Sequence, residues 1–200
     1  MKLLEINECN LGSTGRIMQD IAHAYSGDYL FAVANSRTNK AKKLEHCIYI
    51  GNRISRNISI LFSKYTGING VLNVCSTKSF LKIVDSYKPD IIHLHNLHNC
   101  YINLPILFCY IKSHQIPVIW TLHDCWAFTG QCPHFTLVKC EKWKTGCHDC
   151  PQFRSYPSSY VDRTKLMYKL KKKWFTGVKN MTIVTPSQWL AGLVKQSFLK

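Results

Sequence analysis

Histidine and aspartate side chains stand where an apolar segment ends, in positions suited to binding a substrate and handling protons. His123 follows the apolar run Pro117–Leu122 and is followed at once by Asp124. An imidazole titrates near neutral pH, so it can donate or accept a hydrogen bond there. We therefore expect His123 to be a catalytic residue in contact with substrate and Asp124 to bind beside it. The alternative for His123 is a structural role within the core.

A second pair of histidines ends the earlier apolar segment Asp90–Leu94. Side chains alternate along a strand, so His93 and His95 share one face, and together with His98 they resemble a metal triad. Histidines at strand ends bond more often to backbone or substrate than to a metal. We expect His93 and His95 to contact substrate, and we expect no catalytic metal.

A glycine-containing turn, Gly12-Ser13-Thr14-Gly15-Arg16, follows the first apolar segment, Lys2–Glu8. Backbone N–H groups at the start of a helix can hold a phosphate, and an arginine adds a fork of donors. The turn lacks the third glycine of the dinucleotide fingerprint and is not a Walker loop. A plain tight turn is the alternative, but we expect Gly12, Gly15 and Arg16 to contact the phosphates of a substrate.

Four of the ten cysteines follow one another with the spacing C-x7-C-x6-C-x2-C: Cys132, Cys140, Cys147 and Cys150. The two-residue gap is that of a zinc knuckle, although the upstream pair is wider than in common fingers. The surrounding insertion, about residues 123–160, has few aliphatic residues and no evident core to offset the entropy of ordering it. Structural zinc would supply that order, because metal binding is coupled to folding.

Two other residues of the insertion, Cys125 and His134, are reserve ligands for the zinc. Free thiols are one alternative to a metal site. Disulfides are another, disfavoured in a reducing cytoplasm.

Alternating strand and helix patterns must position these side chains. The strand patterns are Lys2–Glu8, Tyr29–Ala34, His46–Ile50, Asp90–Leu94, Pro117–Leu122 and Met181–Thr185. Helical patterns cover Ile17–Tyr25, Ile54–Tyr65, Ser76–Tyr87, Ile102–Ser113 and Asp162–Val178, and one more runs from Ser187 to the final residues. This alternation predicts one Rossmann-like α/β domain over residues 1–200, with a mostly parallel sheet of about six or seven strands and helices on both faces. Ligands of such sheets bind beyond the carboxyl ends of the strands, so we expect the candidate residues to meet there.

Charge indicates anionic partners: 26 Lys and Arg against 11 Asp and Glu give a formal net charge of +15. The pattern Asp162–Val178 is a basic amphipathic helix, with Met167, Leu170, Trp174 and Val178 on one side and Lys165, Lys169 and Lys172 away from it. Such helices bind anionic membranes, and an ordinary surface helix is the alternative. No apolar run reaches the ~20 residues needed to cross a bilayer and no signal peptide is evident. We expect a cytoplasmic protein, attached peripherally to the inner face of the cell membrane.

Three segments resemble the N-terminal half of bacterial glycosyltransferases of family 4, the kind found in capsular and exopolysaccharide clusters: DIIHLHN at 90–96, PVIWTLHDCWAFTG at 117–130 and IVTPSQWL at 183–190. The likeness spans essentially the whole chain and is specific between residues 90 and 187. It implies the GT-B architecture, in which two Rossmann-like domains face each other across a cleft. It further implies retaining transfer of a sugar, of the hexosyltransferase type, from a nucleotide donor without a catalytic metal.

The resemblance also implies roles for individual residues. The chain matches the acceptor-side domain, whose glycine loop, here Gly12, Gly15 and Arg16, reaches toward the donor phosphates and whose histidine, here His123, contacts the donor sugar. The family's C-terminal nucleotide-sugar-binding domain, with its Glu-x7-Glu motif, is absent from these 200 residues. We therefore expect the isolated chain to transfer little or no sugar, and the acceptor to be a glycan or a polyprenol-linked sugar.

The alternative function is a zinc-dependent binding module for nucleic acid or anionic lipid. The charge of +15 and the cysteine group favour it. Nucleic acid is the less expected partner, because the aromatic and lysine pattern of an RNA-binding sheet is missing.

Overall fold

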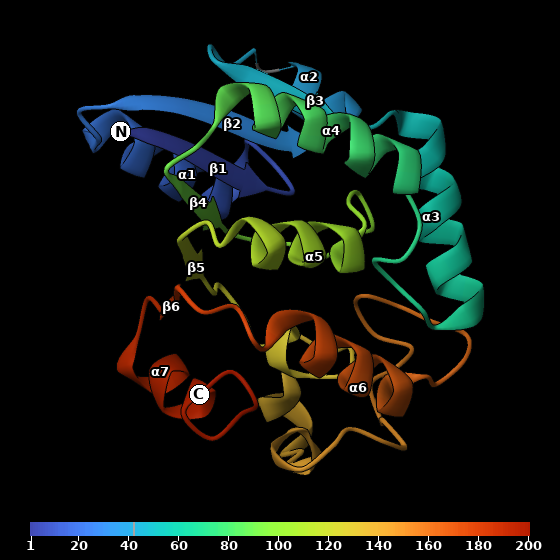
Figure 1. Cartoon of the computed structure of the whole chain (residues 1–200). Coiled ribbons are helices and arrows are strands. Elements are labelled where there is room, and N and C mark those ends of the chain that lie inside the picture. Colours follow the sequence, from blue (N-terminus) through green and yellow to red (C-terminus); the bar gives the residue numbers. More distant parts are fainter. Residues whose placement is uncertain (42) are drawn as a thin grey trace.

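Six parallel strands form one sheet in the order β3-β2-β1-β4-β5-β6 (Figure 1). The computed structural model describes residues 1–41 and 43–200. The strands are β1 (Lys2–Asn7), β2 (Asp28–Ala34), β3 (Cys47–Ile50), β4 (Ile91–Leu94), β5 (Val118–Thr121) and β6 (Met181–Val184). This is the strand order of the doubly wound Rossmann sheet, in which the chain changes direction between β1 and β4. The predicted Rossmann-like α/β class is confirmed.

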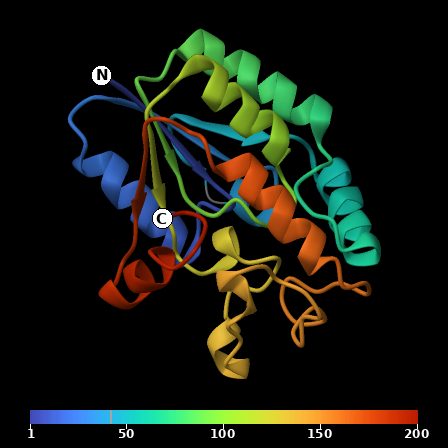
Figure 2. The ribbon, with the colours of Figure 1, turned by 60° about the horizontal axis from the view of Figure 1, so that its bottom comes forward.

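Helices cover both faces of the sheet. They are α1 (Gly12–Ala24), α2 (Arg37–Ala41), α3 (Arg53–Thr66), α4 (Val74–Tyr87), α5 (Leu104–His114), α6 (Thr164–Phe175) and α7 (Gln188–Val194). Figure 2 shows α4, α5 and α6 on one face and α1 on the other. Within the described part of the chain, no helix combines the length and the apolar character needed to cross a membrane.

Alternation along the strands divides the core between the two faces. In β2, Ala32 and Ala34 are buried in the large cluster that includes the apolar side chains of α4, α5 and α6. Phe31 and Val33 of the same strand pack in a smaller cluster with Met18 of α1. Because successive side chains point to opposite faces, a continuous apolar strand supplies both cores at once.

Helix boundaries follow local capping. The side chain of Ser187 accepts a hydrogen bond from Leu190 N, and α7 begins where the sequence predicts. It ends at Val194 instead of running to the final residues, because Ser197 Oγ donates to Val194 O and occupies a carbonyl of the last turn. The helix predicted to reach Val178 ends at Phe175, two residues before Gly177, whose φ of 81° lies in the left-handed region.

Two helices differ further from the sequence pattern. The helix predicted from Ser76 begins at Val74, with Asn73 at its N-cap. Helix α2 is missing from the prediction, since four polar residues and one alanine carry no apolar period.

The cysteine-rich segment packs aromatic side chains that are continuous with the main core, so the expectation that it has no core to order it is wrong. Phe128, Phe135 and Trp143 come from three short 3₁₀ helices, Trp126–Phe128, Phe135–Val138 and Lys142–Lys144. The ring centroids of Phe135 and Trp143 lie 4.8 Å apart and those of Phe128 and Trp143 lie 5.4 Å apart. Each aromatic ring buries as much surface as two aliphatic side chains, so few aliphatic residues are needed.

Helix α6 packs the apolar side predicted for it into the protein interior. Met167 and Trp174 are buried, whereas Lys165, Lys169 and Lys172 are exposed. The apolar side is therefore occupied by the core, and α6 is an ordinary surface helix that presents only its lysine side to a partner.

Lys171, on the inner side of α6, is a buried lysine that was not among the predicted residues. Its Nζ donates to Trp126 O at 2.6 Å and to Thr129 O at 3.2 Å, and it lies 3.5 Å from the centroid of the Trp126 ring. Burial lowers the pKa of Lys171 to about 7. This one side chain joins α6 to the start of the cysteine-rich segment.

Candidate functional site

The predicted histidines gather at the carboxyl ends of the two central strands and of β5. Parallel pairing places Glu5 of β1 beside His93 of β4, and His93 beside Ile119 of β5. His95 lies just past the end of β4, and His123 lies two residues past β5. The cluster is therefore at the point where the sheet changes direction, which is where ligands of such sheets bind.

A continuous chain of hydrogen bonds runs through these residues. Thr121 Oγ1 lies 2.8 Å from His93 Nε2, and His93 Nδ1 lies 3.1 Å from Glu5 Oε1. The second carboxylate oxygen, Glu5 Oε2, lies 2.9 Å from His95 Nε2, and His95 Nδ1 lies 3.0 Å from His123 Nε2. One buried carboxylate thus holds two imidazoles, and the second of these holds His123.

Burial sets the protonation of this chain. For Glu5, burial acts to raise the pKa, but the hydrogen bonds from His93 and His95 outweigh it and the pKa is lowered. Burial lowers the pKa of His95, against the opposing hydrogen bond to Glu5. Burial, with a smaller contribution from the charge of His95, lowers the pKa of His123 to about 4. At neutral pH the chain therefore holds an anionic Glu5 and neutral His95 and His123.

The three histidines predicted to contact substrate differ in how much of each side chain is exposed. His93 and His95 are 4% and 1% exposed, so they lie behind the surface and act on a ligand only through their neighbours. His123 is partly exposed at the end of the chain of hydrogen bonds. Of the three histidines, His123 alone presents a ring edge to a ligand.

Asp124 and His98 form a second pair beside His123. Asp124 Oδ2 lies 3.5 Å from His98 Nε2, and Asp124 Oδ1 accepts a hydrogen bond from Trp126 N. Burial acts to raise the pKa of Asp124, but the hydrogen bond and charge of His98 outweigh it, and the pKa is lowered. His98 is thus not part of the triad with His93 and His95. Its place is taken by Glu5.

Glu5, His93 and His95 offer ligand atoms that all lie within 4.8 Å of one another. All three are buried, and their facing atoms are engaged in the hydrogen bonds given above. A metal ion would have to displace both hydrogen bonds to the carboxylate. The arrangement is therefore already satisfied as a hydrogen-bonded cluster.

The glycine turn lies at the start of α1, directly after β1. No side chain caps this helix, and a Cβ on Gly12 would meet open space. A Cβ on Gly15 would lie 2.4 Å from the backbone carbon of Asn10, so Gly15 permits close packing inside the turn. Arg16 is exposed and reaches Asp20 at 4.0 Å. Gly12 and the start of α1 thus face outward, whereas Gly15 faces the protein.

The four predicted zinc ligands fold into one neighbourhood. A hydrogen bond between the Cys132 and Cys150 thiols raises the pKa of Cys132 and lowers that of Cys150, and both Cys140 and Cys147 act on Cys132 through charge. Gly130 N donates to Cys147 Sγ at 3.1 Å. All four are free thiols. In the described part of the chain no three of these sulfurs lie within 4.8 Å of one another, so metal binding requires them to move together.

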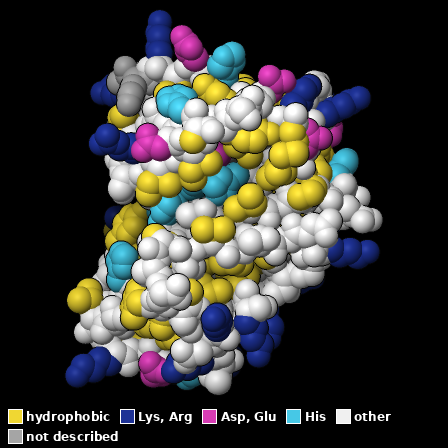
Figure 3. Space-filling view, turned by 90° about the vertical axis from the view of Figure 1, so that its left-hand side faces the viewer, with side chains coloured by type: hydrophobic (Ala, Val, Ile, Leu, Met, Phe, Trp, Pro, Cys, Tyr) yellow, Lys and Arg dark blue, Asp and Glu magenta, His cyan; other side chains and the backbone are white. Residues whose placement is uncertain are grey.

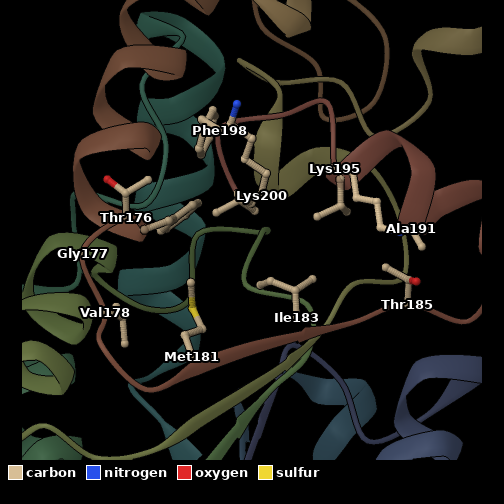
Figure 4. A pocket seen from close by; sticks show the side chains of 13 residues that line it. Thr176, Gly177, Val178, Met181, Ile183, Thr185, Ala191, Lys195, Phe198 and Lys200 are labelled. Atoms are coloured by element: carbon tan, nitrogen blue, oxygen red, sulfur yellow. The ribbon is translucent and has the colours of Figure 1, made fainter.

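Two cavities differ in their relation to the histidines. The cavity of about 430 Å³ in Figure 4 lies among α6, β6 and the C-terminal residues, and it contains none of the predicted site residues. A smaller cavity of about 210 Å³ lies between α3 and the cysteine-rich segment, and His98, Trp126 and Tyr156 line it. His98 connects the smaller cavity to Asp124, which directly follows His123 in the sequence.

Sequence reasoning missed Glu5, Thr121 and Lys171. A signal for Glu5 was present, because an acid within an apolar strand buried on both faces needs a partner. A signal for Lys171 was also present, because its spacing from Met167 and Trp174 places it on the apolar side of the helical pattern.

Comparisons with known proteins extend these observations. No protein-family model matches the chain. The chain is 37% identical over 110 residues to the Escherichia coli K12 protein described as "Putative colanic acid biosynthesis glycosyl transferase WcaC". That match covers 52% of this chain and 27% of the relative, so the chain spans about a quarter of the relative's length.

Among solved structures, the chain was compared with UDP-GlcNAc 2-epimerase from Neisseria meningitidis bound to UDP-GlcNAc. That match has a TM-score of 0.42 and 9% identity, and it covers 92% of this chain and 46% of the other. The sequence match to the Escherichia coli protein confirms the resemblance of this chain to the bacterial glycosyltransferases of polysaccharide biosynthesis.

Proposed function

We propose that this chain is the acceptor-side domain of a retaining glycosyltransferase, which transfers a sugar from a nucleotide-sugar donor to a lipid-linked glycan acceptor. The position of His123 carries the proposal. It is held from behind by Glu5 and His95, and it is presented where ligands bind in sheets of this order. The relationship to a protein described as a glycosyl transferase supports the same reading.

Transfer of this kind depends on holding the donor while its phosphate leaves. The uncapped start of α1, with Gly12 open to solvent, supplies backbone N–H groups and the positive end of a helix dipole for that phosphate. His123 supplies a neutral hydrogen-bonding edge for the sugar. We assign most of the nucleotide binding to a second domain of the kind that the family carries.

The small cavity beside His98 suits one ring of the acceptor. Its volume of about 210 Å³ lies below the ~300–1,000 Å³ of sites for larger ligands. Within the described residues, Trp126 Nε1 and Asn69 Oδ1 are buried at this cavity without a hydrogen-bond partner. A sugar ring offers hydroxyl groups that both donate and accept, so it satisfies the indole N–H and the amide oxygen together.

We also propose that the cysteine neighbourhood binds one structural zinc ion through Cys132, Cys140, Cys147 and Cys150. The facing Cys132 and Cys150 thiols and the N–H donor at Cys147 support a thiolate site. Because the segment also has its aromatic core, the zinc would stabilise an order that the rings already favour.

Attachment to an anionic membrane surface is a further part of the proposal. Besides the lysine side of α6, helix α3 exposes a row of apolar side chains, Ile54, Ile58, Leu61 and Tyr65, each more than half exposed. On the face that Figure 3 shows, Lys and Arg side chains are spread over several separate places. The exposed apolar row of α3 favours a lipid surface, because apolar side chains can enter the interface of a bilayer.

Sugar transfer by the complete gene product tests the proposal. Membranes carrying lipid-linked glycans are incubated with a panel of labelled nucleoside-diphosphate sugars, and label in lipid-extractable product is counted. We expect transfer from one donor by the complete gene product and little or none by residues 1–200 alone. Tight binding of RNA oligomers with a steep salt dependence, and no transfer from any donor, would overturn the proposal in favour of a binding module.

Trp126→Phe tests the acceptor cavity, because it keeps an aromatic ring and removes the N–H. We expect the KM for acceptor to rise about tenfold with the KM for donor unchanged, since one lost hydrogen bond costs about 1.4 kcal/mol. Trp189→Phe, at an exposed position on α7, is the matched control. Equal acceptor KM values in the two variants would remove the cavity from the proposal.

A further inference from the structure

We infer that Glu5 is a positioning residue. Through His95 it fixes His123 as a hydrogen-bond acceptor, so that His123 selects the hydroxyl groups of a substrate. The inference rests on the proposed function only in taking a hydroxyl-rich sugar as the ligand. The fixing itself depends on hydrogen bonds within this chain.

The first step is at the carboxylate of Glu5. An ionised carboxylate only accepts hydrogen bonds. Glu5 Oε1 lies 3.1 Å from His93 Nδ1 and Glu5 Oε2 lies 2.9 Å from His95 Nε2, so each of these nitrogens carries a proton toward Glu5. The Glu5 side chain is 0% exposed, and no water competes for either oxygen.

The second step passes from His95 to His123. A neutral imidazole has one N–H and one lone pair. Since His95 carries its proton on Nε2, its Nδ1 is the lone pair, and that atom faces His123 Nε2 at 3.0 Å. A lone pair on both facing atoms would repel, so His123 carries its proton on Nε2. The hydrogen bonds to Glu5 thus determine the tautomer of His95 and, through it, the tautomer of His123.

The third step concerns the free edge of His123. With the proton on Nε2, the outward Nδ1 is a lone pair, and within the described part of the chain it has no hydrogen-bond partner. It accepts a hydrogen bond from a substrate and has no proton to donate. A sugar hydroxyl can supply that hydrogen bond, whereas a phosphate oxygen, which only accepts, cannot. Glu5, although it is buried in the central strand β1, therefore determines that His123 selects a hydroxyl group.

The surroundings of His123 keep it in this state. The ionisable groups that face it are His93 and His95 from the central strands and Asp124 and His98 beside it. Burial is the largest effect that keeps His123 neutral, because a cation there would lose its hydration. Asp124 opposes this effect, but its charge is already engaged by His98.

The tautomers of the histidines can be read directly by long-range ¹H–¹⁵N correlation spectra of the labelled 200-residue chain. We expect one tautomer for each ring from pH 5.5 to 8, with the proton on Nε2 and a bare Nδ1 in both His95 and His123. A proton on Nδ1 of His123, or an even mixture of its two tautomers, would overturn the inference.

Two variants test the transmission. In His95→Phe the ring remains but the facing nitrogen is lost, and we expect His123 to become a mixture of tautomers. In Glu5→Gln the amide accepts from one imidazole only, so we expect His93 or His95 to change tautomer. If neither ring changes, Glu5 does not fix them. The matched control is Glu8→Gln, the same substitution on a carboxylate that pairs with Arg56 at 2.6 Å, and it should leave the spectra of all three histidines unchanged.

The spectra are recorded without donor or acceptor, so this result is separate from the transfer assay. A single Nε2–H tautomer at His123 with no sugar transfer would retain the inference and remove the proposed function. Sugar transfer together with mixed tautomers at His123 would retain the proposed function and overturn the inference.

Discussion

His95 and His123 face each other with their ring planes within 14° and with Nδ1 of the first 3.0 Å from Nε2 of the second. The pair has room for one proton between the facing nitrogens, so a second proton on His123 can bind only at its outward Nδ1. Burial disfavours the cation that this would create and, with a smaller contribution from the charge of His95, holds the pKa of His123 low.

This relationship predicts how stability depends on pH. The pKa of His123 is about 4 in the folded chain and near 6.5 when unfolded, so the unfolded chain binds more protons between these values. The contribution of His123 to the free energy of unfolding should therefore be constant above pH 6.5 and should fall as pH drops from 6.5 toward 4. In urea unfolding, His123→Gln should show a slope in this window that is shallower by up to about 1.4 kcal/mol per pH unit. Parallel curves for the two proteins would contradict the assignment.

Lys171→Met should destabilise the chain although it removes a buried charge. Two carbonyl oxygens, on Trp126 and Thr129, lose their Nζ donor, and the expected cost is about 2 kcal/mol, or a fall of roughly 4–8 °C in Tm. Lys169→Met, on the exposed side of the same helix, should change Tm by less than about 1 °C. Differential scanning calorimetry of both variants decides the point, and equal Tm values would show that the buried amine is not a structural link.

Gly15→Ala should be strongly destabilising, because the new Cβ would lie 2.4 Å from a backbone carbon of Asn10. Overlap with backbone cannot be relieved by a rotamer change, so we expect a loss of at least about 2 kcal/mol. Gly192→Ala on α7 is the matched control: its Cβ meets nothing within 4 Å, and alanine should stabilise that helix slightly. In chemical unfolding, the free energy of unfolding should fall for Gly15→Ala and rise slightly for Gly192→Ala. A neutral Gly15→Ala would mean that the turn moves freely, and it would weaken the case for a rigid phosphate site there.

The zinc proposal predicts about one zinc ion per chain in protein purified without chelator, measured by atomic emission. Cys147→Ser should lose the metal and lower Tm by several degrees, because a four-thiolate site cannot close without it. Cys75→Ser, at an exposed position on α4, is the control and should keep the metal. Metal-free protein with an ordered cysteine-rich segment would contradict the proposal and leave the aromatic core as the sole source of order.

The fold could be predicted from the sequence because its strands are apolar runs that alternate with helical patterns. Tyr29–Ala34 and Pro117–Leu122 carry that pattern plainly, and both are strands of the central sheet. The partnership of Glu5 and His93 was not readable, since it depends on a pairing register between strands 88 residues apart. Burial of Lys171 was missed for a different reason: lysine is nearly always exposed, so its place on the apolar side of the helical pattern, between Met167 and Trp174, was not used.

Sugar transfer by His123→Ala in the complete gene product tests the central claim most directly. We expect kcat/KM for the nucleotide-sugar donor to fall about 100-fold or more, because a contact at the reacting sugar is lost, while His114→Ala, at an exposed position at the end of α5, keeps the wild-type rate. A His123→Ala protein that transfers sugar as fast as the His114→Ala control would contradict the claim that this histidine, held by Glu5 and His95, is the working edge of the site.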